Sequence, residues 1–469
     1  MLNSFQIQPL AFIPVLAFGA LIEACLPENK PTNISYVHAA GYRWTPPVEL
    51  ANTLVGEASH ELIPTSDNGF MAYWINERGR IDGRWLVAKD LWGYIEDYYF
   101  APEMSHRHNP IVFPYGKLGD KVLVVFRDYD YSQQKVYAST YSYESHWQDP
   151  RTLSKPIDKD SKVEIGEVNA NFLDQFNGFV TWIERTNSSK ISIYLSAFDG
   201  ELDRWGNKIL VSEESYQNPN EIDYTEPLII LNEDKDIIVA WIRKSPQGSD
   251  EIKYCFVTPE TGCKEIKLAF TKASGPLQVG PMRGFAQGKK SGLIWSDSEA
   301  EEVRLRFLSI TPEKSEVPAI IYTGLAGEEI KEIELLKNSE ELEIYWILKT
   351  ENYDSVYTNR FASGAPGTVN SAINDSEKMA RISFLNIVPI GPKDRLISWS
   401  QLEGQQWQLQ LASKKGDLWN KPEKFYFGEI GSSIKSRMAV TSNGSLALVW
   451  KNVMGTDKRI FVTQTQIGR

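Results

Sequence analysis

The sequence predicts an all-β protein that folds as a β-propeller of four-stranded antiparallel blades. Three observations lead to this prediction. A strand-like segment ending in an aromatic residue recurs eight times, turns rich in Asn, Asp, Gly and Lys separate the strand-like segments, and helical periodicity is nearly absent. A four-stranded unit buries both faces of its sheet only against neighbouring units, so a chain of such repeats is expected to close into a ring.

The recurring segment is an apolar alternation that ends in Trp or Phe and leads into polar residues. Successive anchors are 51 to 59 residues apart, and this steady spacing predicts eight blades, with seven blades plus an irregular unit as the alternative. We expect the anchors to pack in the core between blades rather than to stack on a ligand. The anchors are Trp74, Phe126, Trp182, Trp241, Trp295, Trp346, Trp399 and Trp450.

Each repeat carries three further strand-like segments. A short strand precedes the anchor segment, as in residues 226–234, and a third strand follows it, as in residues 191–199. A turn that often bears Trp then leads to a fourth strand, as in residues 208–213. The Asn, Asp and Gly residues of the intervening turns are those of β-hairpins, so the four strands are expected to be antiparallel.

The two ends of the chain carry halves of one repeat. The last repeat has only three strands, whereas residues 34–50 resemble the second half of other repeats, with Trp44 in the turn. We therefore expect Val48–Leu50 to supply the fourth strand of the last blade, which would remove an exposed sheet edge. Residues 34–39 and 459–466 both have the pattern of third strands, so one of them is expected to extend the blade or to lie outside it.

The pattern divides the chain into a signal peptide at residues 1–24, a linker at residues 25–33 and one propeller domain at residues 34–469. Residues 9–22 are fourteen uncharged residues with two prolines. A helix that spans a bilayer needs about 20, so this segment fits the apolar part of a secretory signal, although no Lys or Arg precedes it.

The signal-like segment ends in Ala24–Cys25, which resembles a bacterial lipobox. The resemblance implies lipidation of Cys25 and a location in the bacterial cell envelope, anchored at the outer membrane or in the periplasm. The alternatives are a plain cleaved signal that yields a soluble secreted protein, a misassigned start codon, and a helix that is retained.

Cys255 and Cys263 flank a Pro-Glu-Thr-Gly turn between two strand-like ends. Cysteines placed across a hairpin can form a disulfide in an oxidising compartment, and two unpaired thiols on adjacent strands are the alternative. The chain has no Cys-x-x-Cys or His-x-x-x-His spacing, so we predict no metal site of this type.

The composition excludes several classes of protein. With 42% hydrophobic and 24% charged residues, the chain is globular rather than disordered or fibrous. Its net charge is −11, and no Lys/Arg run forms the basic patch that nucleic-acid binding requires. We expect a monomer that meets the membrane only through its lipid anchor.

The repeat resembles the sialidase-like superfamily of bacterial envelope propellers. The shared pattern is the apolar-Trp strand, an Ile-Tyr-x-x segment and a Gly-x-Trp turn before the fourth strand, and it covers residues 34–469. The Ser-x-Asp-x-Gly-x-x-Trp turns of sialidases are not matched in spacing at residues 66–69 or 199–205. The resemblance implies a glycan ligand, and lyases that act on uronic-acid polysaccharides use related propellers.

The loops that precede the innermost strands of a propeller line one mouth of its axis, so we expect the site residues there. The expected residues of this mouth are His60, Glu61, Ser105, His106, Arg107, His108, Asn109, Glu167, Asn169, Tyr224, Glu226, Arg283, Glu332, Arg381 and Arg437.

The densest cluster of these residues contains His106 and His108, which would face the same side of a strand, with Arg107 and Asn109 beside them. Such a histidine pair could act as acid and base near neutral pH, with Arg107 and Asn109 as ligand contacts. A metal would need a third ligand, which the sequence does not show. The alternative is a polar loop that enters a strand.

Arg283, Arg381 and Arg437 occupy similar places in three repeats. Arginines that converge on one mouth could bind a carboxylate such as that of a sialic or uronic acid through paired hydrogen bonds. Ion pairs between blades are the alternative. The sialidase resemblance implies that Tyr224 and Glu226 form a Tyr/Glu nucleophile pair.

Asp128 follows the second anchor, beside Tyr129 and Asp130, on a loop expected at the same mouth. It could act as an acid, contact the ligand or bind Ca²⁺, and a solvated loop is the alternative. No other cofactor is predicted.

Two functions agree with these observations. The first is a non-catalytic envelope propeller that binds a glycan or an envelope protein at the central mouth. The second is a glycan-active enzyme, either a sialidase-type glycosidase or a uronate lyase, that uses the same mouth. A fold that hosts both binding and catalysis does not decide between them.

Overall fold

The computed structural model describes residues 36–467 with internal gaps and contains strands β1 to β39 in this range. The gaps are residues 53–59, 66–68, 77–80, 89–90, 94–95, 99–107, 117–120, 131–132, 143–145, 155–162, 187–188, 218–221, 246–248, 272–277, 300–301, 313–315, 338–340, 363–364, 367–372, 374–379 and 426–430. Over the residues it describes, no helix is both long and apolar enough to cross a bilayer.

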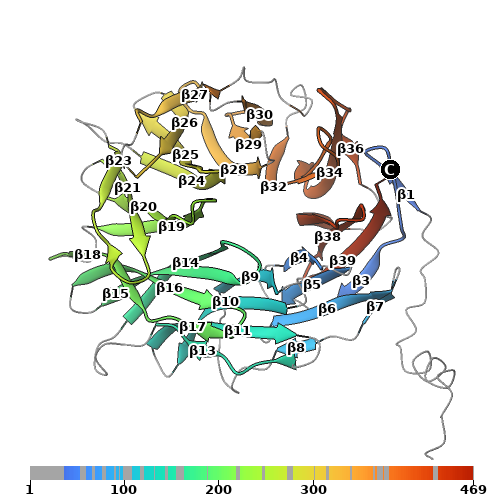
Figure 1. Cartoon of the computed structure of the whole chain (residues 1–469). Helices are drawn as coiled ribbons and strands as arrows, with labels where there is room; N and C mark the ends of the chain where they lie inside the picture. The colour runs from blue at the N-terminus through green and yellow to red at the C-terminus, as the bar shows by residue number, and fades with distance from the viewer. Residues whose placement is uncertain are drawn as a thin grey trace, which may run out of the picture.

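Eight antiparallel sheets stand in a ring around one axis (Figure 1). In each blade the first strand lies innermost, and first strands of consecutive blades contact one another, from β14 through β19, β24, β28, β32, β37 and β4 to β9. The fourth position is often shared by two short strands that pair with the same third strand, as β12 and β13 do with β11. The prediction of an eight-bladed propeller is confirmed.

The first four blades follow one another along the chain, each with its inner strand first. Blade 1 consists of β4 (His60–Pro64), β5 (Phe70–Ile75), β6 (Ile81–Ala88), β7 (Leu91–Trp92) and β8 (Glu96–Tyr98), and blade 2 of β9 (His108–Tyr115), β10 (Lys121–Asp130), β11 (Gln133–Ser142), β12 (His146–Trp147) and β13 (Arg151–Thr152). Blade 3 consists of β14 (Val163–Phe172), β15 (Asn177–Thr186), β16 (Lys190–Asp199), β17 (Arg204–Trp205) and β18 (Ile209–Ser215). Blade 4 consists of β19 (Asp223–Leu231), β20 (Ile237–Lys244), β21 (Glu251–Thr258), β22 (Gly262–Cys263) and β23 (Lys267–Phe270).

The last four blades complete the ring. Blade 5 consists of β24 (Gln278–Gln287), β25 (Lys290–Glu299), β26 (Glu302–Ile310) and β27 (Ala319–Thr323), and blade 6 of β28 (Glu329–Lys337), β29 (Glu341–Lys349), β30 (Asp354–Ala362) and β31 (Ala365–Pro366). Blade 7 consists of β32 (Arg381–Pro389), β33 (Arg395–Glu403), β34 (Gln406–Lys415), β35 (Leu418–Trp419) and β36 (Glu423–Lys424). Blade 8 consists of β37 (Ser432–Val440), β38 (Ser445–Met454) and β39 (Asp457–Gln466), with β3 (Val48–Ala51) as the fourth strand.

The ring closes through the N-terminal part of the chain. The pairing of β3 with β39 places Val48 opposite Val462, and in Figure 1 the blue β3 lies beside the red β39. The predicted closure is therefore confirmed. β39 is the third strand of blade 8, whereas β1 (Val37–Ala39) pairs only with β2 (Tyr42–Trp44) and lies outside the blades.

The anchor residues lie in the core, and their exposed fractions are 0 or 1%. The apolar clusters that contain them join strands of consecutive blades. One such cluster, for example, holds Trp74 of blade 1 together with Val449 and Val462 of blade 8. Each large ring is buried at the boundary between two blades, so its burial stabilises the packing of one blade on the next. One anchor per repeat in the sequence therefore corresponds to one blade in the ring.

A disulfide joins Cys255 of β21 to Cys263 of β22 in blade 4, with Cα atoms 5.9 Å apart. The two strands form the expected hairpin, in which Val257 lies opposite Cys263. Cys25 lies outside the described residues.

Candidate functional site

The two faces of the ring are defined by the direction of the inner strands. The entry face is the face at which each inner strand begins, near Tyr224 and Gln278, and the exit face is the one at which it ends, near Leu231 and Gln287. Because second strands run antiparallel to inner strands, they begin at the exit face and end at the entry face. The predicted mouth corresponds to the entry face.

Some predicted site residues fall on parts of the chain of which little is described. His106 and Arg107 lie outside the described residues. His108 and Asn109 begin β9, and the backbone of Asp128 lies in β10 opposite Lys135. The proposed histidine pair and the Asp128 site therefore stay predictions.

The inner strands carry a recurrent irregularity near the entry face. In each of blades 2 to 8, the register between the inner and second strands shifts by a β-bulge. Three bulge residues, Glu226, Phe384 and Lys435, have positive φ angles of 51°, 62° and 54°. A bulge redirects the side chains around it.

The bulge carboxylates link neighbouring blades. Glu226 Oε2 accepts the backbone N–H of Met282 at 2.6 Å. The two carboxylate oxygens of Glu332 accept the N–H groups of Phe384 and Leu385 at 2.8 and 2.9 Å, and Glu167 accepts the N–H of Glu226. These carboxylates therefore join the inner strands of consecutive blades. Burial raises the pKa of the Glu226 carboxyl, and its bond from the Met282 amide opposes the rise.

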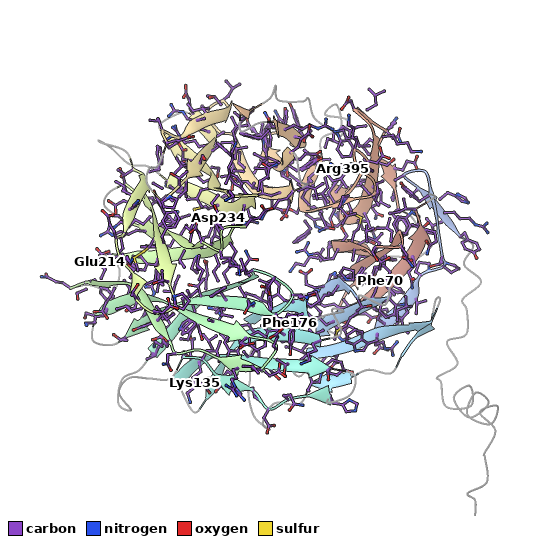
Figure 2. The ribbon with its side chains drawn as sticks, in the orientation of Figure 1. Phe70, Lys135, Phe176, Glu214, Asp234 and Arg395 are labelled. Carbon is purple, nitrogen blue, oxygen red and sulfur yellow. A yellow bond between two sulfur atoms is a disulfide. The ribbon has the colours of Figure 1, made fainter. Side chains whose placement is uncertain are left out.

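Tyr224 takes part in a different cluster. Its hydroxyl donates to Glu214 Oε2 at 3.0 Å and lies 3.4 Å from the Ser212 hydroxyl. Glu214 in turn accepts three hydrogen bonds from the Arg243 guanidinium, at 2.6, 2.9 and 3.2 Å. Figure 2 shows Glu214 on the outer side of the ring, away from its centre. Tyr224 and Glu226 are thus engaged with different partners and are not brought together as a pair.

The three arginines also have separate partners. Arg437 donates to Glu61 at 2.9 Å and so joins blade 8 to blade 1. Arg283 lies 3.8 Å from Glu334 of the next blade. Arg381 donates to Asp354 at 3.1 Å and to the Thr350 and Glu351 carbonyls, each at 2.9 Å. Each guanidinium is therefore paired with acceptors of the protein itself.

Arg283 and Arg437 nevertheless act on one shared carboxyl group near the axis. Burial raises the pKa of Glu334, and the charges of Arg283 and Arg437 both oppose the rise, while Glu332 and Glu61 reinforce it. The inner strands therefore hold a network of alternating charges. This network is the one place near the axis where the described structure gathers several of the predicted residues.

A pocket of about 640 Å³ opens at the entry face between blades 4, 5 and 6. It lies beside the bulges of β24 and β28, at the ends of β20 and β25. Its lining consists of Lys244, Ser245, Asp250, Gln278, Val279, Gly280, Pro281, Ser296, Asp297, Ser298, Val303, Glu328, Glu329 and Ile330.

The charged groups of this entry-face pocket are neutralised by partners in the protein. Lys244 pairs with Asp250 at 2.9 Å, and Asp250 also accepts the N–H of Val279. Buried Asp297 pairs with Arg306 at 2.6 Å. Two carboxylates at the edge of the pocket are also engaged, because Glu329 pairs with Lys349 and Glu328 accepts the N–H of Leu325.

The groups that remain available in the pocket are neutral. The Gln278 amide and the Ser298 hydroxyl form no hydrogen bond among the described residues and lie on exposed positions. Gly280 gives room to a further hydroxyl, because a Cβ atom at this position would lie 2.3 Å from Ser296 Oγ. The pocket thus combines neutral donors and acceptors with the apolar groups of Val279, Pro281 and Ile330.

Sequence reasoning placed this region at the mouth but did not select these residues. Gln278 and Ser298 carry no charge and form no motif, so nothing distinguished them from ordinary loop residues. The available signal was positional, because both lie beside the start of an inner strand. Across the part of the chain that the structure describes, no three His, Cys, Asp or Glu side chains are placed to hold a metal ion.

No known protein-family model matches the chain. No curated protein matches it either. Among solved structures, the chain is similar to the polysaccharide lyase Uly1, with 10% identity, a TM-score of 0.45, and coverage of 80% of this chain and 93% of that chain. It is also similar to the BP39L lectin from Burkholderia pseudomallei, with 12% identity, a TM-score of 0.41, and coverage of 79% and 98%.

The WD40 domain of SCAP from fission yeast has 10% identity and a TM-score of 0.45, and the match covers 91% of this chain and 98% of that one. Likenesses at this level concern the fold and leave ligand and activity open.

Proposed function

We propose that the protein is a non-catalytic propeller that binds a glycan in the entry-face pocket. One observation carries this proposal: the pocket pairs off its charged groups and leaves neutral hydroxyl and amide groups available. Gln278 offers a carbonyl oxygen and an NH₂ group, and Ser298 offers a hydroxyl that both donates and accepts.

A polyhydroxylated ligand matches these groups. Sugar hydroxyls can donate to the Gln278 carbonyl oxygen and accept from the Gln278 NH₂ group, and they can donate to or accept from the Ser298 hydroxyl. Half-buried Pro281 in the lining provides apolar contact for the C–H face of a sugar ring. A pocket of about 640 Å³ lies within the range of small-molecule sites and holds more than one such ring.

The same pairing disfavours catalysis in this pocket. General acid–base chemistry needs a group that is free to exchange a proton with the substrate. Asp250 is committed to Lys244 and to the Val279 amide, and Asp297 is committed to Arg306. The pocket can therefore recognise a ligand without changing it.

We further propose that Cys25 anchors the protein to the bacterial cell envelope, with a glycan or an envelope protein as partner. The lipobox-like Ala24–Cys25 sequence supports this location. Expression of the full chain with Cys25→Ser is expected to move the protein from the membrane fraction to the soluble fraction, and an unchanged distribution would remove the anchor from the proposal.

The binding proposal is tested by screening the full chain against a glycan array and measuring hits by calorimetry. Gln278→Ala and Ser298→Ala are each expected to weaken binding about fivefold to tenfold, which corresponds to one lost hydrogen bond of about 1 kcal/mol. Gln405→Ala is the matched control, because Gln405 is an exposed glutamine of the entry face in blade 7. If the array yields no ligand, or if all three variants bind equally, the proposed site is wrong.

A glycan-active enzyme is the second candidate, and Glu334 is the observation that favours it. Glu334 lies on an inner strand 3.8 Å from Arg283, and burial raises the pKa of its carboxyl, which is the direction that general acid catalysis uses. Turnover of sialyl or uronate substrates that disappears in Glu334→Gln would support this candidate. The absence of turnover on both substrate classes by the unaltered protein would discard it.

A further inference from the structure

A second pocket lies on the exit face, between blades 5 and 6, where nothing in the proposed function places a ligand. Its volume is about 170 Å³. It is formed by the ends of β24, β26 and β30 and by the starts of β25 and β29. Its lining consists of Phe285, Gln287, Lys290, Phe307, Ser309, Glu316, Leu342 and Phe361.

The floor of this exit-face pocket is aromatic. Phe307 stacks on Phe285 with ring centroids 5.2 Å apart and on Phe361 with centroids 4.6 Å apart. These rings and Leu342 belong to the apolar core cluster between blades 5 and 6. The floor is therefore apolar and held by two blades, and the part of Phe307 that stays exposed, 7% of its surface, is where a six-membered ring can make an apolar contact.

The size of the pocket limits its occupant to about one ring. An apolar protein cavity of about 150 Å³ accommodates a benzene molecule. The exit-face pocket, at about 170 Å³, is slightly larger and open on one side. A two-ring ligand would therefore project beyond it into solvent.

The rim of the pocket carries two opposite charges that are not paired with each other. The Lys290 ammonium and the Glu316 carboxylate are exposed and form no ion pair or hydrogen bond with other described residues. Neighbouring Lys289, by contrast, pairs with Asp234 at 2.7 Å. The Gln287 amide on the rim is likewise without a partner among the described residues.

We propose that the exit-face pocket binds a small molecule that has a single six-membered ring and carries both an anionic and a cationic group. The ring packs on the Phe307 floor, the anionic group pairs with Lys290, and the cationic group pairs with Glu316. Free aromatic amino acids have this pattern of charges. The inference is independent of the proposed glycan site, which lies on the opposite face of the ring.

The test uses L-phenylalanine as the probe and the full chain as the protein, with binding followed by saturation-transfer NMR. For a ligand of this size, a dissociation constant of about 1 mM is expected. 3-Phenylpropanoate lacks the ammonium and 2-phenylethylamine lacks the carboxylate, so each is expected to bind about two- to fivefold more weakly than L-phenylalanine, as for the loss of one exposed ion pair.

Variants locate the site. Lys290→Gln is expected to weaken L-phenylalanine binding about two- to fivefold and to leave 2-phenylethylamine unaffected, while Lys289→Gln changes neither. Ser309→Phe places a ring in the pocket and is expected to abolish binding, with the circular dichroism spectrum as the check of its fold. If Ser309→Phe does not fold, Lys290→Gln still tests the site, because Lys290 lies on the surface and its replacement is not expected to disturb the fold.

Three results would overturn the proposal. They are no L-phenylalanine binding by the unaltered protein at about ten times the expected dissociation constant, equal binding by Lys290→Gln, and equal affinity for toluene, which has the ring without either charge. Loss of glycan binding in Gln278→Ala with unchanged L-phenylalanine binding separates the two sites.

Discussion

The imidazole of His60 makes the stability of the ring depend on pH. His60 begins β4, lies opposite the anchor Trp74 and is 3% exposed. Burial lowers the pKa of His60 to about 3, and the positive charges of Arg437, Lys451 and Lys435 act in the same direction, against a smaller opposite contribution from the Lys435 backbone. The folded protein therefore holds this side chain neutral at any pH above about 3.

The size of the effect follows from the difference between the two pKa values. In the unfolded chain the pKa of a histidine is about 6.5, so below that pH the unfolded state takes up a proton that the folded state does not. The free energy of unfolding is expected to be nearly unaffected above pH 7 and to fall by about 2 kcal/mol at pH 5, and the loss reaches about 4 kcal/mol at pH 3.

The assay compares the unaltered protein with His60→Gln, which retains a polar side chain of similar size but does not titrate. Urea unfolding at pH 8 and pH 5 gives the loss of stability for each protein. Because the other titrating groups are common to both, the unaltered protein should lose about 2 kcal/mol more than the variant between the two pH values. Equal losses in the two proteins would refute the reasoning.

Three further predictions concern contacts that hold the ring together. Glu226→Ala leaves the Met282 N–H without its acceptor and is expected to lower the free energy of unfolding, measured in urea, by about 1–3 kcal/mol. A loss below about 0.5 kcal/mol would show that this carboxylate does not stabilise the contact between blades 4 and 5. Replacing Cys255 and Cys263 by Ser removes a short covalent loop and should cost about 2–3 kcal/mol in the same assay, and dithiothreitol should reproduce this loss in the unaltered protein but not in the variant. Removal of residues 1–51 deletes β3 and exposes the edge of β39, so light scattering should detect oligomers that are absent when only residues 1–35 are removed.

The fold was predictable because a few residues determine it. Anchors such as Trp241 and Trp295 recur at nearly constant spacing, and each must be buried on both sides, which only a stack of blades achieves. The closure was predictable for a similar reason, because Val48–Leu50 follow Trp44 as the fourth strand follows the Trp turn in other repeats. Neither inference depends on where an individual side chain points.

The site was less predictable because it depends on side-chain direction. Glu226 was expected to act as a nucleophile, yet a β-bulge at that position lets its carboxylate accept the Met282 amide of the next blade. Nothing in the sequence marks this bulge, since its positive-φ residues in three blades are Glu226, Phe384 and Lys435 rather than glycine. The sequence therefore led to charged residues as candidates, whereas neutral Gln278 and Ser298, which form the proposed site, were not predicted.

The pairing of Arg437 with Glu61 also bears on which ligand the protein can accept. A ligand carboxylate at Arg437 would compete with Glu61, which already accepts from Arg437 Nε at 2.9 Å and loses no translational freedom when it makes the contact. An acidic sugar therefore gains little at this arginine, whereas a neutral sugar in the entry-face pocket meets hydroxyl and amide groups that compete with no internal ion pair. On this argument, binding of a neutral glycan should vary little between 50 and 200 mM salt, while a strong decrease would show that ionic contacts carry the affinity.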